Sequence, residues 1–377
     1  MDRRGSVYVF SLGMVVLAIV VGAAILVRGT TEVDNSERSV NQAEAFQLAD
    51  AALDQAMINL RVNNTASISS TPLASGKYWV DITSLGNQRY QVTAHGSSAG
   101  EQRDIEAVVE RTPKSVFGDG PLHGDLAVRM KKGGFTDSYD SSQGDGKYNP
   151  NTAGKKGNIS TNNTAVASIV LENGTAVNGR LIVGPDMTNP ESAVNKDDSV
   201  VITAPDPKIV SAPQKLLMDP VDTQNLQCVT GSLNQSSTLP PNTTSTWSQS
   251  GSPYCYNALK TDQGSVITVS GNVEVYANTI DFDKNLEINK DGKPTQLILQ
   301  LYGTSDVVIA KEGTFVGAIY APKVKVNLQK VVDFYGSLVA KEVDIDKESK
   351  FHYDEALKNC TSPRGGYKTQ VKSWRDL

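Results

Sequence analysis

The sequence predicts a mainly β protein with one long N-terminal α-helix, a small antiparallel sheet after it, and a larger β-rich part beyond. Three observations predict this class. The chain has no proline before Pro72 and shows helical periodicity there, three segments with two-residue alternation follow, and short apolar runs separated by turn residues fill the remainder. For the larger part we expect a β-solenoid, with a β-sandwich as the alternative.

The N-terminal segment divides into a short leader, residues 1–5, and an apolar stretch, residues 6–28. No charged residue stands between Gly5 and Val27, and about 20 apolar residues are enough for a helix to cross a bilayer. Arg3 and Arg4 precede the stretch, which favours a cytoplasmic N-terminus with the rest of the chain outside. The alternative is a cleaved secretory signal peptide, although its apolar region is normally shorter.

Residues 29–62 continue the helix in amphipathic form. Apolar side chains recur at three-to-four spacing, which predicts a buried stripe along one face. The stripe consists of Ala45, Leu48, Ala49, Ala52, Leu53, Ala56, Met57 and Leu60. We therefore expect one helix from about Ser6 to about Arg61, whose first half suits lipid and whose second half packs under a soluble part.

A basic leader ending in Gly, followed by the apolar helix and by ERSVNQAEAFQLADAALDQA, resembles the N-terminus of type IV pilins and pseudopilins, in particular PilX-type minor pilins. The resemblance implies that a prepilin peptidase cuts after Gly5 and makes Ser6 the new N-terminus. It implies three partners: the prepilin peptidase, inner-membrane lipid, and other pilin or pseudopilin subunits. Phe10 departs from the pattern, because major pilins carry Glu there, and this fits a tip or initiating subunit.

Residues 63–111 predict a small pilin-like β-meander. KYWVDITSL, QRYQVTAHG and QRDIEAVVER each alternate with a two-residue period and are separated by turn-prone residues. One face of the three strands would carry Tyr78, Val80, Ile82, Tyr90, Val92, Ala94, Ile105, Ala107 and Val109. Three short strands rarely hold together alone, so we expect this face to pack on the helix stripe.

Residues 112–150 are rich in Gly, Asp and Ser and predict a loop-rich linker. Asp137, Asp140 and Asp145 cluster there as weak Ca²⁺ candidates, since Ca²⁺ takes oxygen ligands. Their spacing matches no defined calcium loop, which favours a solvated turn. We expect no catalytic residue, no cofactor-binding residue and no cofactor.

Residues 151–358 contain the recurring apolar runs that predict the solenoid-like head. GAIYAPKVKVN from Gly317 and GSLVAKEVDID from Gly336 match 19 residues apart, and a period near 20 is typical of one solenoid coil. The match would pair Ile319 with Leu338, Ala321 with Ala340, Val324 with Val343, and Val326 with Ile345. Residues 219–261 are predicted to be an insertion, and residues 359–377 a tail that caps the solenoid. The head passages also resemble the β-helical head found behind PilX-type N-termini.

Cysteine and charge content limit the function. Three cysteines are too few for a disulfide framework, but Cys228 and Cys255 flank one polar stretch and could close it with a disulfide in an oxidising compartment. A net charge of -5 gives no electrostatic reason to expect nucleic acid as a partner. Seven N-x-[ST] triplets leave a eukaryotic single-pass glycoprotein open as a class.

The function predicted from these observations is structural. We expect a non-enzymatic minor pilin-like subunit related to type IV pili or type II secretion, held in the bacterial inner membrane with its head outside the cytoplasm, which contributes to pilus assembly or to display at the tip for adhesion. The alternative is an exported, membrane-anchored β-helix protein that binds or cleaves carbohydrate. The scattered carboxylates form no paired constellation of the kind glycosidases use.

Overall fold

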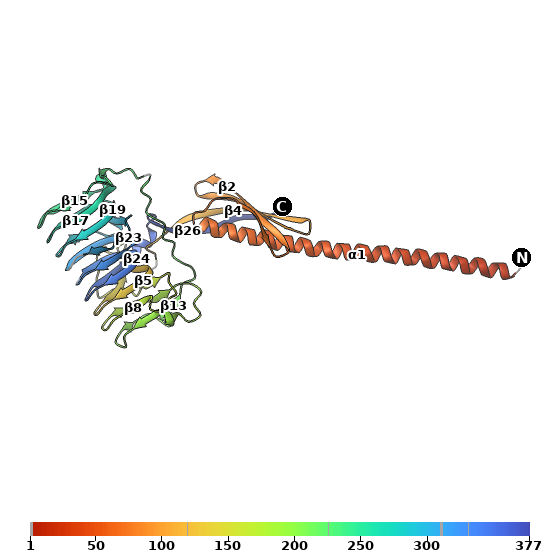
Figure 1. Ribbon diagram of the computed structural model, residues 1–377, viewed down its shortest axis with the longest axis horizontal. Coiled ribbons are helices and arrows are strands. Elements are labelled where there is room, and N and C mark those ends of the chain that lie inside the picture. The colour runs from red at the N-terminus through yellow and green to blue at the C-terminus, as the bar shows by residue number, and fades with distance from the viewer. Residues whose placement is uncertain (1–2, 119, 225, 310–311, 331) are drawn as a thin grey trace. The chain divides into compact units, whose positions relative to one another are not determined.

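The chain forms two compact units (Figure 1). The computed structural model describes residues 3–118, 120–224, 226–309, 312–330 and 332–377, with side chains described except at 3–11 and 364–366. Unit 1 comprises Met1–Thr112 and Tyr367–Leu377, and unit 2 comprises Pro113–Gly366. The protein is mainly β with one long N-terminal helix and an antiparallel sheet, as the sequence predicted.

Helix α1 (Arg3–Arg61) is continuous over 59 residues. It ends where the periodicity of the sequence predicted and begins three residues before Ser6. All members of the predicted stripe are buried except the half-buried Met57. Five stripe residues form one hydrophobic core with the sheet of unit 1, so the second half of the helix is held by apolar burial: Ala49, Ala52, Leu53, Ala56 and Leu60.

The sheet of unit 1 has the strand order β1-β2-β3-β4-β26. Its strands are β1 (Ile68–Leu73), β2 (Gly76–Gly86), β3 (Arg89–Ser98), β4 (Glu101–Ser115) and β26 (Arg364–Asp376). The three predicted strands are present, and antiparallel pairing joins β2 to β3 and β3 to β4. All nine residues of the predicted apolar face lie in the core shared with α1 or pack against it.

Gly96 lets the helix lie directly on β3. A Cβ atom at this position would stand 2.0 Å from the carbonyl oxygen of Ala45 and 2.5 Å from the amide nitrogen of Ala49. Only glycine fits between two backbones this close. This local contact explains why a polar-looking strand end, HGSS, packs under the helix.

Unit 2 is built from strands of 2 to 16 residues that pair in parallel. The first group comprises β5 (Leu122–Met130), β6 (Phe135–Tyr139), β7 (Ile159–Thr161), β8 (Ile169–Leu171), β9 (Ala176–Val177), β10 (Leu181–Val183), β11 (Val194–Lys196), β12 (Val201–Ile202) and β13 (Ile209–Ser211). The second group comprises β14 (Thr230–Gly231), β15 (Ser237–Leu239), β16 (Thr244–Ser248), β17 (Tyr254–Thr261), β18 (Val266–Ser270), β19 (Val273–Phe282), β20 (Glu287–Ile288), β21 (Leu297–Leu301), β22 (Val307–Ile309), β23 (Gly313–Leu328), β24 (Val332–Ile345) and β25 (Lys350–Asp354). In the part of this unit that the structure describes, four short 3₁₀ turns lie between strands or after them: η1 (Pro190–Ala193), η2 (Gln249–Gly251), η3 (Pro294–Gln296) and η4 (Glu355–Asn359).

The chain enters this stack of strands in its middle. β5 pairs with β24 on one side and with β7 and β8 on the other, so the first and last parts of unit 2 lie side by side. From β5 the chain proceeds to β13, crosses to β14, and returns through β17, β19 and β23 to β24. Figure 1 shows β15 and β13 at opposite ends of the stack. The β-sandwich alternative is wrong, because the strands of this unit pair in parallel along this path.

The predicted repeat lies in β23 and β24, and its first half pairs as expected. Gly317 stands opposite Gly336, Ile319 opposite Leu338 and Ala321 opposite Ala340. Beyond Ala321 the register shifts, so that Val326 stands opposite Val343 and Leu328 opposite Ile345. The predicted pairs Val324 with Val343 and Val326 with Ile345 are therefore wrong. The shift follows Pro322, which has no N–H for the ladder and is tolerated in a strand mainly at such a bulge.

Three segments contain strands where the sequence predicted a linker, an insertion and a capping tail. The stretch predicted as a loop-rich linker, 112–150, contains β5 and β6 at the centre of the stack. The predicted insertion, 219–261, contributes β14 to β17, of which β17 pairs with β19. The predicted capping tail, 359–377, contains β26, which pairs with β4 in unit 1 and is held there by ion pairs from Lys372 to Glu110 and from Arg375 to Glu106.

Candidate functional site

The first half of α1 exposes a continuous apolar surface. Large side chains between Leu12 and Val27 are each about half exposed or more. Within the described residues, one helix is long and apolar enough to cross a membrane, and this part of it is unburied. Exposed apolar area of this extent needs a cover of lipid or protein, so this surface is the first candidate for function.

The predicted processing residues lie at the start of the same helix. Gly5 and Ser6 belong to α1, but the side chains of Ser6 and Phe10 lie outside the described ones. The cleavage site is therefore inferred from the sequence pattern alone.

The C-terminal end of α1 is bound by the guanidinium of Arg111, which is 5% exposed. Its Nη1 donates to the carbonyl oxygen of Leu60 and to Asn63 Oδ1, at 3.4 and 3.1 Å. Its Nη2 donates to Tyr90 Oη at 2.7 Å, and the group lies 4.0 Å from the ring centroid of Tyr367. One side chain thus joins the end of the helix, the middle of the sheet and the C-terminal strand.

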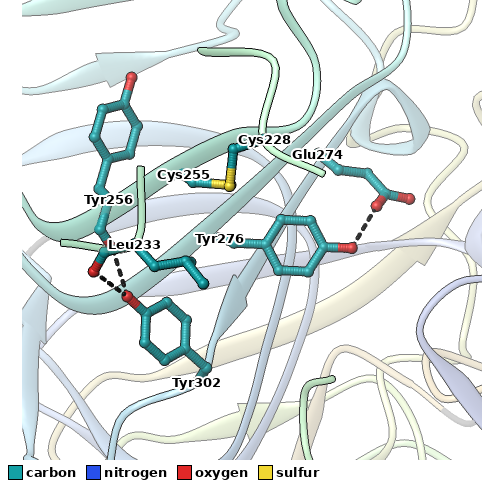
Figure 2. Close-up of a disulfide and its surroundings, with 7 residues drawn as sticks. All are labelled: Cys228, Leu233, Cys255, Tyr256, Glu274, Tyr276 and Tyr302. Carbon is teal, nitrogen blue, oxygen red and sulfur yellow. Dashed lines mark hydrogen bonds between the residues drawn. A yellow bond between two sulfur atoms is a disulfide. The ribbon is translucent and has the colours of Figure 1, made fainter. Parts of the chain in front are cut away.

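Figure 2 shows the disulfide between Cys228 and Cys255. Cys255 is buried in β17, and Cys228 lies in the segment that crosses from β13 to β14. Nearby, the hydroxyl of Tyr302 donates to the carbonyl oxygens of Leu233 and Tyr256, at 3.1 and 3.0 Å. The disulfide and this tyrosine together fix the beginning of the returning half of the stack.

The three weak Ca²⁺ candidates do not converge on one point. Asp137 is fully buried, with Oδ1 2.6 Å from His352 Nδ1 and Oδ2 accepting from the hydroxyl of Tyr148 at 2.6 Å. Asp140 accepts from the backbone and hydroxyl of Ser142, and Asp145 accepts from the backbone of Lys147. Among the described residues no group of three or more His, Cys, Asp or Glu side chains could hold a metal ion. These aspartates act in the core and in turns.

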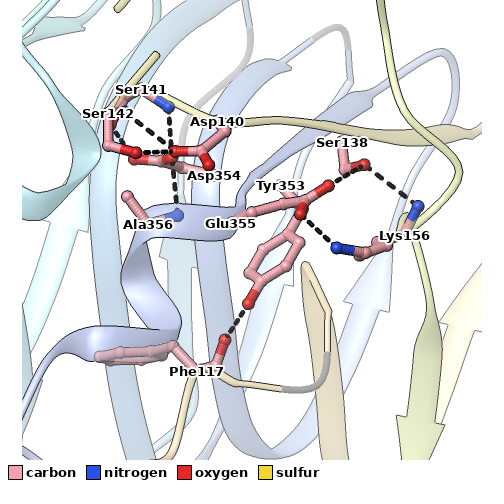
Figure 3. A network of polar contacts seen from close by, with 10 residues as sticks. All are labelled: Phe117, Ser138, Asp140, Ser141, Ser142, Lys156, Tyr353, Asp354, Glu355 and Ala356. Carbon is pink, nitrogen blue, oxygen red and sulfur yellow. Dashed lines mark hydrogen bonds and ion pairs between the residues drawn. The ribbon is translucent and has the colours of Figure 1, made fainter.

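The loop that carries Asp140 and Asp145 is fastened to the start of η4, as Figure 3 shows. Asp354 is fully buried and accepts from the backbone of Ser141 at 2.9 Å, from its hydroxyl at 2.6 Å, and from the backbone of Ala356 at 3.1 Å. Burial raises the pKa of Asp354, while the hydrogen bonds from Ser141 lower it in part. The neighbouring Glu355 binds Ser138 and Lys156, which ties the far side of the loop as well.

An open cavity of about 350 Å³ lies beside this loop. Three tyrosines line it: Tyr139 from the end of β6, Tyr148 from the loop, and Tyr335 from β24. Their ring centroids are 5.6 to 6.4 Å apart, and the rings meet edge to face, an arrangement that aromatic pairs prefer. Further lining residues are Gly146, Lys147, Lys290, Asp291, Gly292, Thr314, Val316 and Asp333.

Behind the tyrosines lies the buried imidazole of His352. Its ring centroid is 3.9 Å from that of Tyr148 and 4.7 Å from that of Tyr335. Burial raises the pKa of all three cavity tyrosines, and for Tyr148 the hydrogen bond to Asp137 adds to the effect. The phenols therefore stay protonated in neutral solution and can donate hydrogen bonds.

Sequence reasoning missed this cavity. Tyr139 and Tyr148 are close in the sequence, but Tyr335 follows nearly 200 residues later and joins them because β24 lies beside β5 and β25 beside β6. The local signal was the pair of aromatic residues in a Gly-, Asp- and Ser-rich stretch, since loops of this composition on a rigid scaffold often carry binding residues.

Comparison with known proteins adds little. Residues 257–360 match a family described as a domain of unknown function, DUF7305. No curated protein matches the chain. A solved structure, the competence-associated pilin ComZ from Thermus thermophilus, aligns with 89% of this chain and 97% of its own, at 12% identity and a TM-score of 0.32. At this TM-score the alignment carries no argument.

Proposed function

We propose that this chain is a non-enzymatic, membrane-anchored surface protein of pilin-like build, related to type IV pili or type II secretion. The observation that carries the proposal is the division of one continuous helix into two halves. From Leu12 to Val27 the helix is apolar and exposed, and from Ala45 to Leu60 its stripe is buried under an antiparallel sheet. The first half is free to enter lipid or a bundle of like helices while the second half holds the folded part.

The N-terminal charges and the disulfide support an orientation in which unit 2 lies outside the cytoplasm. Arg3 and Arg4 precede the apolar half, and positive charges favour the cytoplasmic side of a membrane. The disulfide between Cys228 and Cys255 lies in unit 2, and disulfides persist in oxidising compartments. Both features favour unit 2 outside the cytoplasm and the anchor in the inner membrane.

Phe10 supports a low-copy role in a filament. In the pilin pattern a Glu at this position neutralises the terminal ammonium of a neighbouring subunit, because an unpaired charge in lipid is costly. With Phe10 that partner is missing from this chain. The subunit would therefore stand at the tip or at the start of a filament, in PilX-like fashion, and take part in assembly or adhesion through the head.

The head itself we interpret as a β-solenoid. Paired residues are 19 apart in the first part of the β23–β24 pairing, 17 apart after the register shift, and 21 apart between β17 and β19, close to one solenoid coil. Among the described residues, the fully buried carboxylates of Asp137 and Asp354 are each held by hydrogen bonds from their surroundings, and we assign them a structural role.

The mature N-terminus tests the proposal. The chain is expressed in a bacterial host with and without a prepilin peptidase, membranes are isolated, and the N-terminal peptide is identified by mass spectrometry. We expect Ser6 at the terminus only with the peptidase, loss of cleavage in Gly5→Leu, and normal cleavage in the control Gly13→Leu. An intact leader in the presence of the peptidase overturns the processing, and a terminus near residue 25 overturns the anchor.

A further inference from the structure

We propose that the tyrosine-lined cavity of unit 2 binds an uncharged saccharide. The proposal does not depend on membrane anchoring, because every residue that carries it lies in unit 2. The volume, about 350 Å³, lies within the range of small-ligand sites.

The aromatic wall is held rigid before any ligand arrives. Tyr335 stacks on His352, and Tyr148 packs against the same imidazole with its ring tilted. Asp137 fixes His352 and Tyr148 through its two carboxylate oxygens. The loop that carries Tyr148 is fastened at Ser141 by the buried Asp354. Rings fixed in this way lose little freedom on binding, so contact with a ligand is converted efficiently into affinity.

The cavity also has unused hydrogen-bonding groups. Among the described residues, the hydroxyls of Tyr139 and Tyr335, the amine of Lys147 and the carboxylate of Asp291 make no hydrogen bond. They offer donors and acceptors around an apolar wall. A sugar requires this combination, because its C–H face packs on the electron-rich face of an aromatic ring while its hydroxyls need both donors and acceptors.

The charges of the lining favour a neutral ligand. Lys147 and Lys290 are matched in number by Asp291 and Asp333. Lys290 is ion-paired with Glu287, and Asp333 with Lys350, so Lys147 and Asp291 are the lining charges to which the described residues give no ion pair. One charge of each sign gives no net attraction for a cation or an anion, and the tyrosine rings contact one another edge to face, unlike the walls of an open cation-binding cage. This balance suits an uncharged saccharide.

The test is a binding measurement on the full chain in phosphatidylglycerol nanodiscs, whose lipid carries neither sugar nor choline. The probes are maltose, cellobiose, lactose and di-N-acetylchitobiose, with digalacturonic acid as the acidic comparison and choline as the cationic one. We expect saturable binding of at least one neutral disaccharide by calorimetry and saturation-transfer NMR. Binding of none of the four, or tighter binding of the acid or of choline, overturns the proposal.

Variants locate the site. Tyr335→Ala removes an aromatic face and should weaken binding on the order of tenfold, whereas Tyr335→Phe keeps the ring and should weaken it only about two- to threefold. Lys147→Ala, at an exposed side chain, should weaken it about two- to fivefold without affecting folding. Tyr276→Phe, at a tyrosine that binds Glu274 beside the disulfide (Figure 2), is the matched control and should not change it.

The variants distinguish binding in the cavity from binding elsewhere on the protein and from loss of folding. If Tyr335→Ala fails to fold, the location of the site is tested with Tyr335→Phe, Lys147→Ala and Asp291→Asn, the last at the exposed rim of the cavity. Binding that none of these variants weakens lies elsewhere on the protein and overturns the proposal. A failure here leaves Ser6 processing untouched, so it is distinguishable from a failure of the proposed anchor.

Discussion

The guanidinium of Arg111 lies between two rings, 4.5 Å from the centroid of Tyr90 and 4.0 Å from that of Tyr367. The two tyrosines come from β3 and β26, so a residue at the end of unit 1's first segment connects it to the last strand of the chain. The same group binds the carbonyl oxygen of Leu60 at the end of α1. Arg111 is therefore the point at which the three parts of unit 1 are joined.

Arg111→Lys should destabilise unit 1 by roughly 1–3 kcal/mol, because a lysine ammonium cannot reproduce the planar fork of hydrogen bonds and leaves buried acceptors unpaired. Urea unfolding followed by circular dichroism measures the change. Arg89→Lys is the matched control at an exposed arginine in β3. Equal stability of the two variants would contradict the role given to Arg111.

Gly96→Ala should separate α1 from the sheet. The new methyl group would collide with the backbone of Ala45 and Ala49, and overpacking of this kind typically costs about 1–3 kcal/mol. Gly29→Ala is the control in the same unit, since a Cβ there meets nothing within 4 Å and alanine favours helix by about 1 kcal/mol. Hydrogen exchange at the amides of β3 should rise only in Gly96→Ala, and unchanged exchange would refute the close approach.

The double variant Cys228→Ser and Cys255→Ser should lower the free energy of unfolding by about 2–4 kcal/mol, because the disulfide restricts the unfolded chain. Cys360→Ser is the control. Burial raises the pKa of the Cys360 thiol to about 11, so iodoacetamide should leave it unmodified in the native protein at neutral pH. Thermal unfolding monitored with and without reductant measures the effect. A reductant that leaves the wild-type midpoint unchanged would argue against the disulfide.

Asp137→Asn should destabilise unit 2 by roughly 1–3 kcal/mol, because the buried His352 and Tyr148 lose a charged partner. Asp145→Asn, at an exposed turn where the amide oxygen can still accept, should have little effect. Neither millimolar calcium nor a chelator should move the thermal midpoint of the wild type. A calcium-dependent midpoint that Asp145→Asn abolishes would restore the metal hypothesis for this loop.

Docking of the C-terminal strand should weaken in acid. The hydrogen bonds that Arg375 and Gln91 donate to Glu106 lower the pKa of its carboxyl group below the ordinary value of 4.5. A lowered folded-state pKa gives stability that is present above about pH 4.5 and lost as the pH falls through the folded-state pKa. The stability difference between wild type and Glu106→Gln should therefore be largest at neutral pH and vanish in acid. Glu37→Gln, on an exposed part of α1, should show no such difference.

Local patterns were sufficient for the helix and for three of the five strands of unit 1. The helix end at Arg61 and the strands β2, β3 and β4 followed from three-to-four and two-residue periodicity, because each is decided by which side chains face one common core. The C-terminal strand β26 was not predicted as part of this sheet, because the ion pairs that hold Lys372 and Arg375 on Glu110 and Glu106 of β4 join residues far apart in the sequence.

In unit 2, strand pairings between segments far apart in the sequence could not be predicted from local patterns. The repeat between Gly317 and Gly336 was visible because its two copies are consecutive. The pairing of Leu338 with Leu122 joins residues more than 200 positions apart, and no periodicity signals it. The cavity tyrosines were missed for the same reason, because their meeting depends on this pairing and on the one between β25 and β6.

Because β26 is the last strand of the chain, its pairing with β4 also fixes the order in which the two units can be completed during synthesis. The ribosome completes α1 and β4 first, and then translates nearly all of unit 2 before β26 emerges, an interval of roughly 10–50 s at about 5–20 residues per second. During that interval the outer edge of β4 has no neighbour, and open strand edges promote pairing with other chains and aggregation. A chain that stops early never covers this edge. The sheet of unit 1 can therefore be completed by β26 only after the whole of unit 2 has been synthesised.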